Sequence, residues 1–316
     1  MNDLLLNTSM STVLPAMQLA WDSTSMGLLK ECPKKYELSI LQGWTPKRTS
    51  VHLLFGQWYH GALERYDHAR CDGLSHDDAL DKAVEYTLLV TWNSKLRRPW
   101  ISDDPNKNRF TLLRTVVWYL EQFGVDDALH TVRLSNGKPA VELSFRFYSG
   151  YTTSMGEQLI ICGHLDRVAQ WNDDFHILDR KTSKNTITED FFKSFSPDNQ
   201  MSTYDAAGNV VYNLPIKGII IDAAQVAVTF SRFLRGFTPR TESQREEWLE
   251  DWSMWAKMAE FYATTGRWPM NDKSCGNYGG CIFRGICSKP KSTREVWLKA
   301  DFTKRVWDPL VTRGDI

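Results

Sequence analysis

Apolar residues recur at helical spacing through the first third of the chain. One or two short helices are expected between Trp21 and Gln42, where apolar positions mostly return every three or four residues. A second helical pattern starts near Phe55, and two more cover about 76–97 and 109–123. The spacing therefore predicts a mostly helical first third.

The hydrophobic pattern changes near position 140. In Val141-Glu-Leu-Ser-Phe145-Arg-Phe147, apolar and polar residues alternate with a period of two, which predicts a strand. Leu159–Trp171 and Phe175–Lys181 predict two further strands, and Asn172-Asp173-Asp174 between them is typical of a hairpin turn. We therefore expect two paired strands directly after the first one.

Helices and strands then alternate towards the carboxyl end. The pattern predicts a helix around 198–207, strands over 216–230 and 232–237, and a long tryptophan-rich helix from Thr241 or Ser243 to about 264. This order predicts an α/β fold of the mixed α+β kind, with a central mixed β-sheet flanked by helices. We expect a single domain between two short end segments, divided as follows: segment 1–20, domain 21–290 (helical part 21–135, sheet core 136–240, long helix and cysteine loop 241–290) and tail 291–316.

Composition supports a soluble globular protein. The chain has 316 residues, of which 42% are hydrophobic and 24% charged. Since 38 basic residues balance 38 acidic ones, an anionic substrate must be held by local positive charge. Candidate bases for this are Lys34, Lys35, Lys47, Arg48, Lys95–Arg98, Lys184, Arg232 and Arg235. Some of the 13 tryptophans are candidates for stacking on unpaired bases, although tryptophan is more often a core residue.

We expect no targeting or membrane segment. The start, Met1-Asn-Asp-Leu-Leu-Leu-Asn, carries an acid where a secretory signal carries bases. The most apolar run, 216–230, is interrupted by Lys217 and Asp222, so it is unsuited to crossing a bilayer. A cytoplasmic location is the expectation, without a membrane partner.

Acidic and basic residues coincide on the predicted hairpin. Asp179 and Lys181 are two apart on one strand, so their side chains share a face, and the hairpin brings Asp166 beside them. Two close carboxylates repel each other unless a divalent cation lies between them, which favours Mg²⁺ or Mn²⁺. Glu142, on the preceding strand, is a third carboxylate within reach of that ion. The chemistry indicated is phosphodiester hydrolysis, although an Asp-x-Lys triplet by itself is common as a solvated edge pair.

The chain resembles the PD-(D/E)XK nucleases, in particular the RecB-like branch that includes the CRISPR-associated iron–sulfur exonucleases and the phage recombination exonucleases. Four motifs carry the resemblance, and they occur in the family's order. They are Gly56-Gln-Trp-Tyr-His60-Gly-Ala-Leu-Glu64, Gly163-His-Leu-Asp166, Asp179-Arg-Lys181 and Gln200-Met-Ser-Thr-Tyr204.

The resemblance implies a role for each matching residue. It makes Asp166 and Asp179 metal ligands, Lys181 the catalytic lysine, and His60 a further ligand or a group that orients the phosphate. A histidine such as His60, taken alone, is more often an ordinary helix residue. The hypothesis that His60 belongs to the site therefore depends on the other motifs.

A later helix completes the implied site. Gln200 and Tyr204 are one helical turn apart, and the resemblance implies that both line the site and touch the DNA backbone. Taken alone, the two residues would be an ordinary helix face.

Cysteines cluster near the end of the chain. Cys275, Cys281 and Cys287 form a C-x5-C-x5-C array, and three thiolates need a fourth ligand. Iron–sulfur members of the family take it from an amino-terminal helix, which Cys32-Pro-Lys-Lys-Tyr36 matches here. The resemblance therefore implies a [4Fe–4S] cluster bound by the carboxy-terminal cysteine loop. Many relatives have C-x2-C before the last gap, so a structural Zn²⁺ site stays open as the alternative. Cys71 and Cys162 have no partners at useful spacing and are expected in the core.

The sequence thus predicts a metal-dependent deoxyribonuclease. The expected activity is that of an exonuclease on single-stranded DNA or DNA ends, without sequence specificity, in recombination, repair or replication. The resemblance to phage exonucleases makes a phage origin one expectation, with a homo-oligomer or a recombination or replication protein as a possible partner. The rival is a noncatalytic or weakly active DNA-binding subunit of a larger nuclease, helicase or integration complex.

Overall fold

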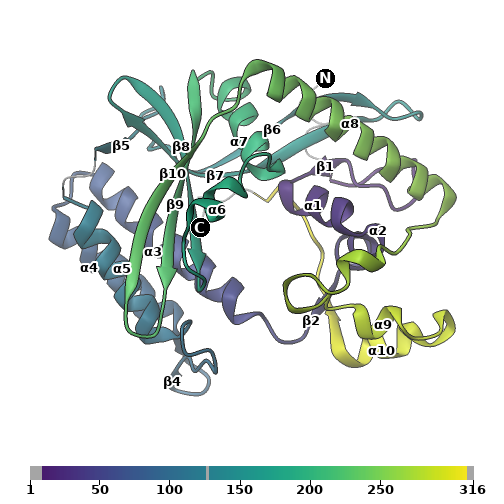
Figure 1. Cartoon of the computed structure of the whole chain (residues 1–316), viewed down its shortest axis with the longest axis horizontal. Coiled ribbons are helices and arrows are strands. Elements are labelled where there is room, and N and C mark those ends of the chain that lie inside the picture. The colour runs from purple at the N-terminus through teal and green to yellow at the C-terminus, as the bar shows by residue number, and fades with distance from the viewer. Residues whose placement is uncertain (1–8, 126–127, 312–316) are drawn as a thin grey trace. The chain divides into compact units, whose positions relative to one another are not determined.

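The computed structural model describes residues 9–125 and 128–311 (Figure 1). Their contacts divide the described chain into two units. The first unit comprises 9–48, 144–163 and 241–311, and the second comprises 49–143 without 126–127, together with 164–240. Strands β6 (Val141–Thr152) and β7 (Gln158–Trp171) contribute residues to both units. Each unit is described by itself.

The second unit contains the helices and strands that carry the predicted acidic motifs. Besides the ends of β6 and β7, its elements are α3 (Val51–Cys71), α4 (His76–Val90), β3 (Trp92–Asn93), β4 (Arg98–Pro99), α5 (Arg109–Phe123), β5 (Leu129–Thr131), β8 (Asp174–Ser183), α6 (Glu189–Lys193), α7 (Asn199–Val210), β9 (Ile216–Val226) and β10 (Ser231–Thr238).

The sheet of this unit is mixed. β7 pairs with both β5 and β8 in antiparallel fashion, β8 pairs with β9 in parallel, and β9 pairs with β10 antiparallel. The antiparallel pair β7–β8 is the hairpin expected from the sequence, and its turn residue Asn172 has φ +53°, a conformation that asparagine tolerates better than most residues. The prediction of a mixed sheet is confirmed.

Helices cover both faces of this sheet. On one face, α3, α4 and α5 bury an apolar cluster against Ala224, Val226 and Phe233 of β9 and β10, and Figure 1 shows these helices beside the two strands. On the other face lies α7, where a Cβ at Gly208 would meet Ile177 and Ile216. Because successive side chains of a strand point to opposite faces, β8 directs alternate residues towards the two helical layers.

The first unit combines the two ends of the chain. Besides parts of β6 and β7, its elements are β1 (Ala20–Trp21), α1 (Ser23–Glu31), α2 (Pro33–Tyr36), a π-helical turn η2 (Glu37–Leu41), β2 (Trp44–Pro46), α8 (Glu242–Thr265), the 3₁₀ turns η3 (Asp272–Ser274), η4 (Asn277–Gly279) and η5 (Lys291–Thr293), α9 (Arg284–Cys287), α10 (Arg294–Asp301) and β11 (Phe302–Lys304).

Aromatic side chains form much of this unit's core. Trp21 stacks on Tyr36 at 5.2 Å between ring centroids, and Trp252 of α8 meets Trp21 edge to face. Trp248 and Trp252 are buried, as the tryptophan spacing of α8 predicts. The segment 291–316, expected as a tail, contains α10 and β11, and β11 pairs with β2 in antiparallel fashion.

Several element boundaries differ from those predicted. The helix expected over 76–97 ends at Val90, and the short β3–β4 hairpin follows, in whose turn Leu96 N donates to Asn93 Oδ1. The strand expected over 216–230 ends at Val226, since Ala227 N donates to Phe230 O in the turn before β10. The long helix begins as predicted after Thr241, whose side chain accepts from Gln244 N.

Among the helices of the described ranges, none is both long and apolar enough to cross a membrane.

Candidate active site

The two predicted aspartates lie on neighbouring strands of the second unit. Arg167 of β7 is opposite Leu178 of β8, so the next residues along this antiparallel pair, Asp166 and Asp179, share one face of the sheet. The backbone N–H of Arg180 donates to Asp166 Oδ2 at 2.9 Å. Both aspartates are buried, with Asp166 7% and Asp179 1% exposed. The structure therefore brings these carboxylates together, as the hairpin pattern predicts.

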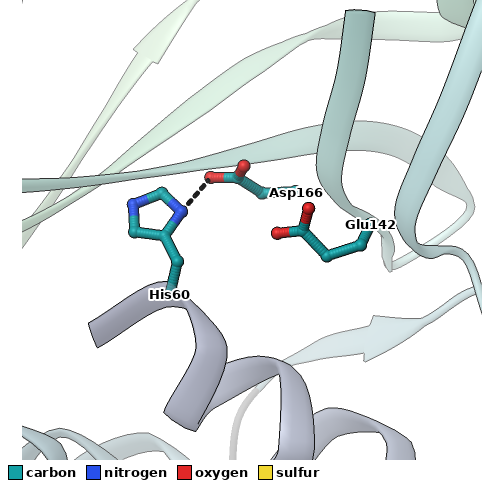
Figure 2. Close-up of side chains that lie close together, drawn as sticks. All are labelled: His60, Glu142 and Asp166. Atoms are coloured by element: carbon teal, nitrogen blue, oxygen red, sulfur yellow. Dashed lines mark ion pairs between the residues drawn. The ribbon is translucent and has the colours of Figure 1, made fainter. Parts of the chain in front are cut away.

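A histidine and a second carboxylate join Asp166. His60 of α3 places Nδ1 3.2 Å from Asp166 Oδ2, and Glu142 at the start of β6 points to the same place (Figure 2). One ligand atom from each of these three residues lies within 4.8 Å of the others. Glu142 has φ +49°, an unfavourable conformation for a residue with a Cβ. Such strain is often found at functional sites.

Lys181 is held by groups from two elements. Its Nζ lies 2.8 Å from Asp179 Oδ2 and donates to Gln200 Oε1 of α7 at 2.9 Å. Gln200 Nε2 in turn donates to the hydroxyl of Tyr204 at 2.8 Å. The predicted Gln-x3-Tyr helix thus contacts the lysine directly, and Tyr204 is only 6% exposed.

The charges of this site shift several pKa values. Burial raises the pKa of Asp179 to about 6, with repulsion from Asp166 adding to it and Lys181 opposing it. Burial also opposes ionisation of Asp166, but the charge and hydrogen bond of His60 outweigh it and hold the pKa of Asp166 well below its usual range. Burial disfavours the charged forms of His60 and Lys181, yet the two aspartates raise the pKa of both. The two aspartates therefore favour the protonated forms of both neighbouring bases.

The donor set fits a divalent cation. His60, Glu142 and Asp166 offer one nitrogen and carboxylate oxygens, and oxygen-rich sets suit Mg²⁺ and Mn²⁺. Asp179 is outside the 4.8 Å group, and its buried Oδ2 has no hydrogen bond beyond its ion pair with Lys181. The attraction that raises the pKa of His60 also favours a bound cation.

The four cysteines of the predicted cluster converge in the first unit. Cys32, Cys275, Cys281 and Cys287 line one small cavity. Asn271 fastens the two chain segments, because its backbone N–H donates to Cys32 Sγ at 3.3 Å and its side chain donates to Glu31 O at 2.8 Å. Cys32 and Cys275, which are 243 positions apart in sequence, thus line the same cavity with their thiols.

These thiols suit a bound metal group. Burial raises the pKa of Cys287, the charge of Arg294 opposes this rise, and repulsion from the other three cysteines adds to it, so a bound cation would stabilise the thiolates. Cys162, by contrast, is buried in β7 as an ordinary core residue, and Cys71 is half-buried at the end of α3.

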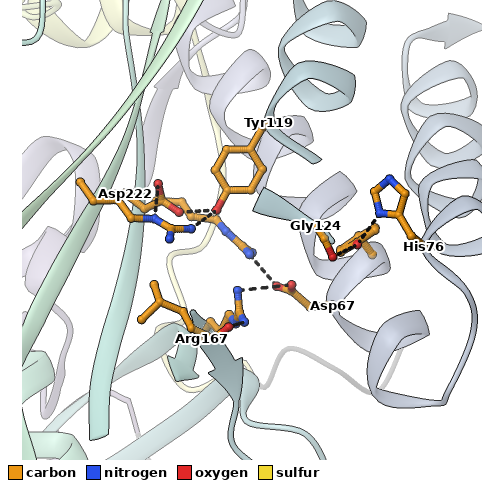
Figure 3. Close-up of polar contacts among 10 residues, drawn as sticks. Asp67, His76, Tyr119, Gly124, Arg167 and Asp222 are labelled. Carbon is orange, nitrogen blue, oxygen red and sulfur yellow. Dashed lines mark hydrogen bonds and ion pairs between the residues drawn. The ribbon is translucent and has the colours of Figure 1, made fainter. Parts of the chain in front are cut away.

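A buried ionic network behind the active site was not foreseen from the sequence (Figure 3). Arg180, whose neighbours in sequence are Asp179 and Lys181, points to the opposite face and donates to Asp67 Oδ2 of α3 at 2.6 Å. Arg167 NH1 lies 3.7 Å from Asp67 Oδ1. Since α3 carries both His60 and Asp67, it contacts β7 and β8 at two places. The alternation of β8 put Arg180 on this face, but no local pattern named Asp67 as its partner.

The same network continues across the sheet. Tyr119 of α5 donates to Asp222 Oδ2, and Arg235 Nε lies 3.4 Å from Asp222 Oδ1 (Figure 3). Arg235 also lies over the ring of Phe123, with its Cζ 3.9 Å from the ring centroid. Arg235, considered above as a DNA-binding base, is therefore engaged within the protein.

Comparison with known proteins gives a family match over most of the chain. A family model described as the PD-(D/E)XK nuclease superfamily matches residues 23–288. None of the curated proteins matches the chain. Among solved structures, the chain is similar to a candidate exonuclease from Eubacterium rectale at 12% identity, over 88% of this chain and 92% of that one, with a TM-score of 0.46. It is also similar to the protein SSO0001 at 12% identity, over 75% of this chain and 94% of that one, with a TM-score of 0.32.

The family match includes α3, the β7–β8 hairpin and α7, and it extends through the cysteine array. Since it spans most of the chain, the protein belongs to the PD-(D/E)XK nuclease superfamily.

Proposed function

We propose that this nuclease is a Mg²⁺- or Mn²⁺-dependent deoxyribonuclease whose ion is held by His60, Glu142 and Asp166, with Asp179 as a further ligand. The observation that carries the proposal is the convergence of three ligand atoms within 4.8 Å beside the Asp179–Lys181 ion pair. Residues 21–290 form the nuclease domain in this proposal, in keeping with the family match over 23–288.

Lys181 acts in its protonated form. Its raised pKa, caused by Asp179 and Asp166 against the effect of burial, makes it a poor base at neutral pH. The ammonium group can instead offset the negative charge that develops on the phosphate in the transition state. A bound divalent ion polarises a phosphoryl oxygen and lowers the pKa of a water molecule.

Gln200 and Tyr204 position the lysine. The Gln200 amide gives its hydrogen to Tyr204 OH, which leaves Oε1 directed at Lys181 Nζ. Burial raises the pKa of Tyr204, and the nearby Asp179 and Asp166 add to this rise, so its hydroxyl stays neutral. We propose that Gln200 is the group of this pair that comes closest to the DNA backbone, because Tyr204 is buried.

We propose action on single strands or DNA ends, in recombination, repair or replication and with a phage origin. The resemblance to phage recombination exonucleases supports these finer assignments. The test incubates single- and double-stranded DNA, labelled at either end, and a closed circle with Mg²⁺ or Mn²⁺. Release of labelled nucleotides from linear DNA with an intact circle is the expected result. Cleavage of the circle would make the enzyme an endonuclease, and uncut DNA in every arm would favour the noncatalytic subunit.

We also propose that Cys32, Cys275, Cys281 and Cys287 bind a [4Fe–4S] cluster that fastens the two ends of the chain together. The shared cavity of the four thiols supports this proposal. Protein purified without oxygen should be brown and contain about four irons per chain. Colourless protein with one zinc would replace the cluster with a tetrahedral zinc site.

A further inference from the structure

A basic groove in the first unit has no role in the proposed chemistry. It has a volume of ≈ 600 Å³ and lies between η2, β2, α9, α10 and β11. Binding pockets for small ligands usually have volumes of about 300–1,000 Å³, so the groove is large enough to take part of a substrate.

The groove carries an excess of positive charge in a chain whose net charge is zero. Its lining contains five cationic and two anionic side chains. The two acids are already paired, because Glu37 binds Lys34 and Glu295 lies 2.7 Å from Lys299 Nζ. The remaining three cations are Lys291, Arg294 and Lys304.

These three cations keep their charge available. Arg294 donates to the carbonyls of Cys287 and Lys289 at 2.9 and 3.0 Å, and Lys304 donates to Gln42 O. Carbonyl oxygens fix the direction of a cationic side chain, but they do not neutralise its positive charge. Within residues 9–125 and 128–311, the exposed Lys291 has no ion-pair partner.

The floor of the groove is apolar. It is formed by the buried side chains of Leu38, Trp44, Ile286, Leu298 and Phe302. Lys304 Nζ lies over the Trp44 ring, 4.0 Å from its centroid. These floor residues are only 4–7% exposed, so the groove presents cations to phosphates rather than ring faces to bases. A positively charged groove that follows the backbone is a feature of sites for single-stranded nucleic acid.

We infer that this groove binds the phosphates of single-stranded DNA through Lys291, Arg294 and Lys304. The inference rests on the proposed function for the choice of ligand, since a nuclease that acts on DNA must hold that polyanion. Binding through phosphates requires no base sequence, which agrees with the expected lack of sequence specificity. The groove is thus a second binding surface for the substrate, built from residues other than the metal and lysine site.

The test measures how salt weakens binding of a fluorescein-labelled oligothymidylate to the full-length protein. Fluorescence anisotropy is recorded in EDTA, so that the strand stays intact. Each phosphate contact with single-stranded DNA contributes about 0.7 to the slope of log K against log salt. Lys291→Gln should therefore reduce the slope by about 0.7, and Lys291→Gln with Lys304→Gln by about twice that value.

Lys257→Gln is the matched control, because it removes an exposed lysine from α8 of the same unit. It should bind as the wild type does. If Lys291→Gln keeps the wild-type slope and affinity, the inference is wrong. It is also wrong if the protein binds polyglutamate but not the oligothymidylate and Lys291→Gln weakens that binding.

Failure of this inference can be told apart from failure of the proposed function. Hydrolysis of bis(p-nitrophenyl) phosphate, a small diester that needs only the metal and lysine site, should be equal in wild type and Lys291→Gln. If the wild type hydrolyses neither this diester nor DNA, the proposed enzymatic function is wrong. The salt dependence of oligothymidylate binding then still tests whether the groove binds the strand.

Discussion

Lys181 keeps its proton in a site where two carboxylates surround it. Burial alone would favour the neutral amine, but Asp179 and Asp166 outweigh that effect and raise the pKa. Asp179 and Asp166 thus keep Lys181 protonated. Its hydrogen bond to Gln200 fixes the direction of the side chain.

Replacing this lysine should slow hydrolysis more than it weakens binding. We expect Lys181→Gln to lower kcat by about 10²–10³-fold, the usual cost of removing one transition-state charge partner. KM should change little, because the groove and the metal ligands remain. Steady-state kinetics on a labelled strand measures both values. Lys217→Gln, at an exposed position near the start of β9, is the control and should behave as wild type. Equal loss in both variants would contradict the role of Lys181.

Glu260 of α8 provides a test of pH dependence in the first unit. Its carboxylate accepts from Tyr151 OH at 2.6 Å and from Ser154 N at 2.7 Å. Burial opposes its ionisation, but the hydrogen bonds from Ser154 and Tyr151 outweigh this and lower the pKa of Glu260.

A lowered carboxyl pKa stabilises the fold above the unfolded-state pKa, and this stability disappears as pH falls through the lower, folded-state pKa. At neutral pH, Glu260→Gln should lower the free energy of unfolding by about 1.5–3 kcal/mol, as expected for hydrogen bonds to a charged group. Between about pH 5 and 3, wild type should therefore lose more stability than the variant. Urea unfolding at several pH values measures this difference, and parallel curves for the two proteins would refute the argument.

At the scale of elements, β8 presents different side chains to the two faces of the sheet. Asp179 and Lys181 point to the face of α7, while Arg180 between them points to α3. The backbone N–H of Arg180 also donates to Asp166. Arg180 therefore contacts Asp166 through its backbone and Asp67 through its side chain.

Removing Asp67 should destabilise the second unit. Asp67→Asn leaves the buried guanidinium of Arg180 without its anion, and breaking a buried ion pair in this way typically costs about 3–5 kcal/mol. Asp67→Leu combined with Arg180→Met should lose less, because Arg180 then leaves no buried charge and only the longer 3.7 Å pair of Asp67 with Arg167 is broken. Denaturant unfolding of the two variants gives the comparison. A loss below about 1 kcal/mol for Asp67→Asn, as for a surface pair, would contradict this account.

The periodicity of the chain predicted most of these elements, and local chemistry explains the misses. The strand-like segments on either side of Asn172-Asp173-Asp174 predicted β7 and β8 as a hairpin. The two-residue period of a strand put Asp179 and Lys181 on one face, and the hairpin brought Asp166 beside them. Helix α4 was predicted too long, since apolar spacing continues into 91–97 although Thr91 and Asn93 favour a turn. The partnership of Asp67 with Arg180 joins positions 113 residues apart, so no local pattern contained it.

At the scale of the whole molecule, a net charge of zero conceals two sites of opposite character. The second unit gathers carboxylates around His60, where a divalent cation would bind, and the first unit gathers cations in its groove, where phosphates would bind. Each site combines residues that are distant in sequence. The motifs contained His60 and Asp166 of the carboxylate site, and Glu142 was predicted from its place on the preceding strand. The groove, in contrast, is formed by residues from both ends of the chain, and no motif indicated it.

The central claim is that His60, Glu142 and Asp166 hold the ion that permits hydrolysis. Titration of Mn²⁺ into wild type and Asp166→Asn, followed by electron paramagnetic resonance and paired with a DNA degradation assay, tests it most directly. We expect wild type to bind Mn²⁺ and degrade DNA, and Asp166→Asn to lose both while it still unfolds cooperatively. Asp166→Asn that binds Mn²⁺ and degrades DNA as well as wild type would contradict it.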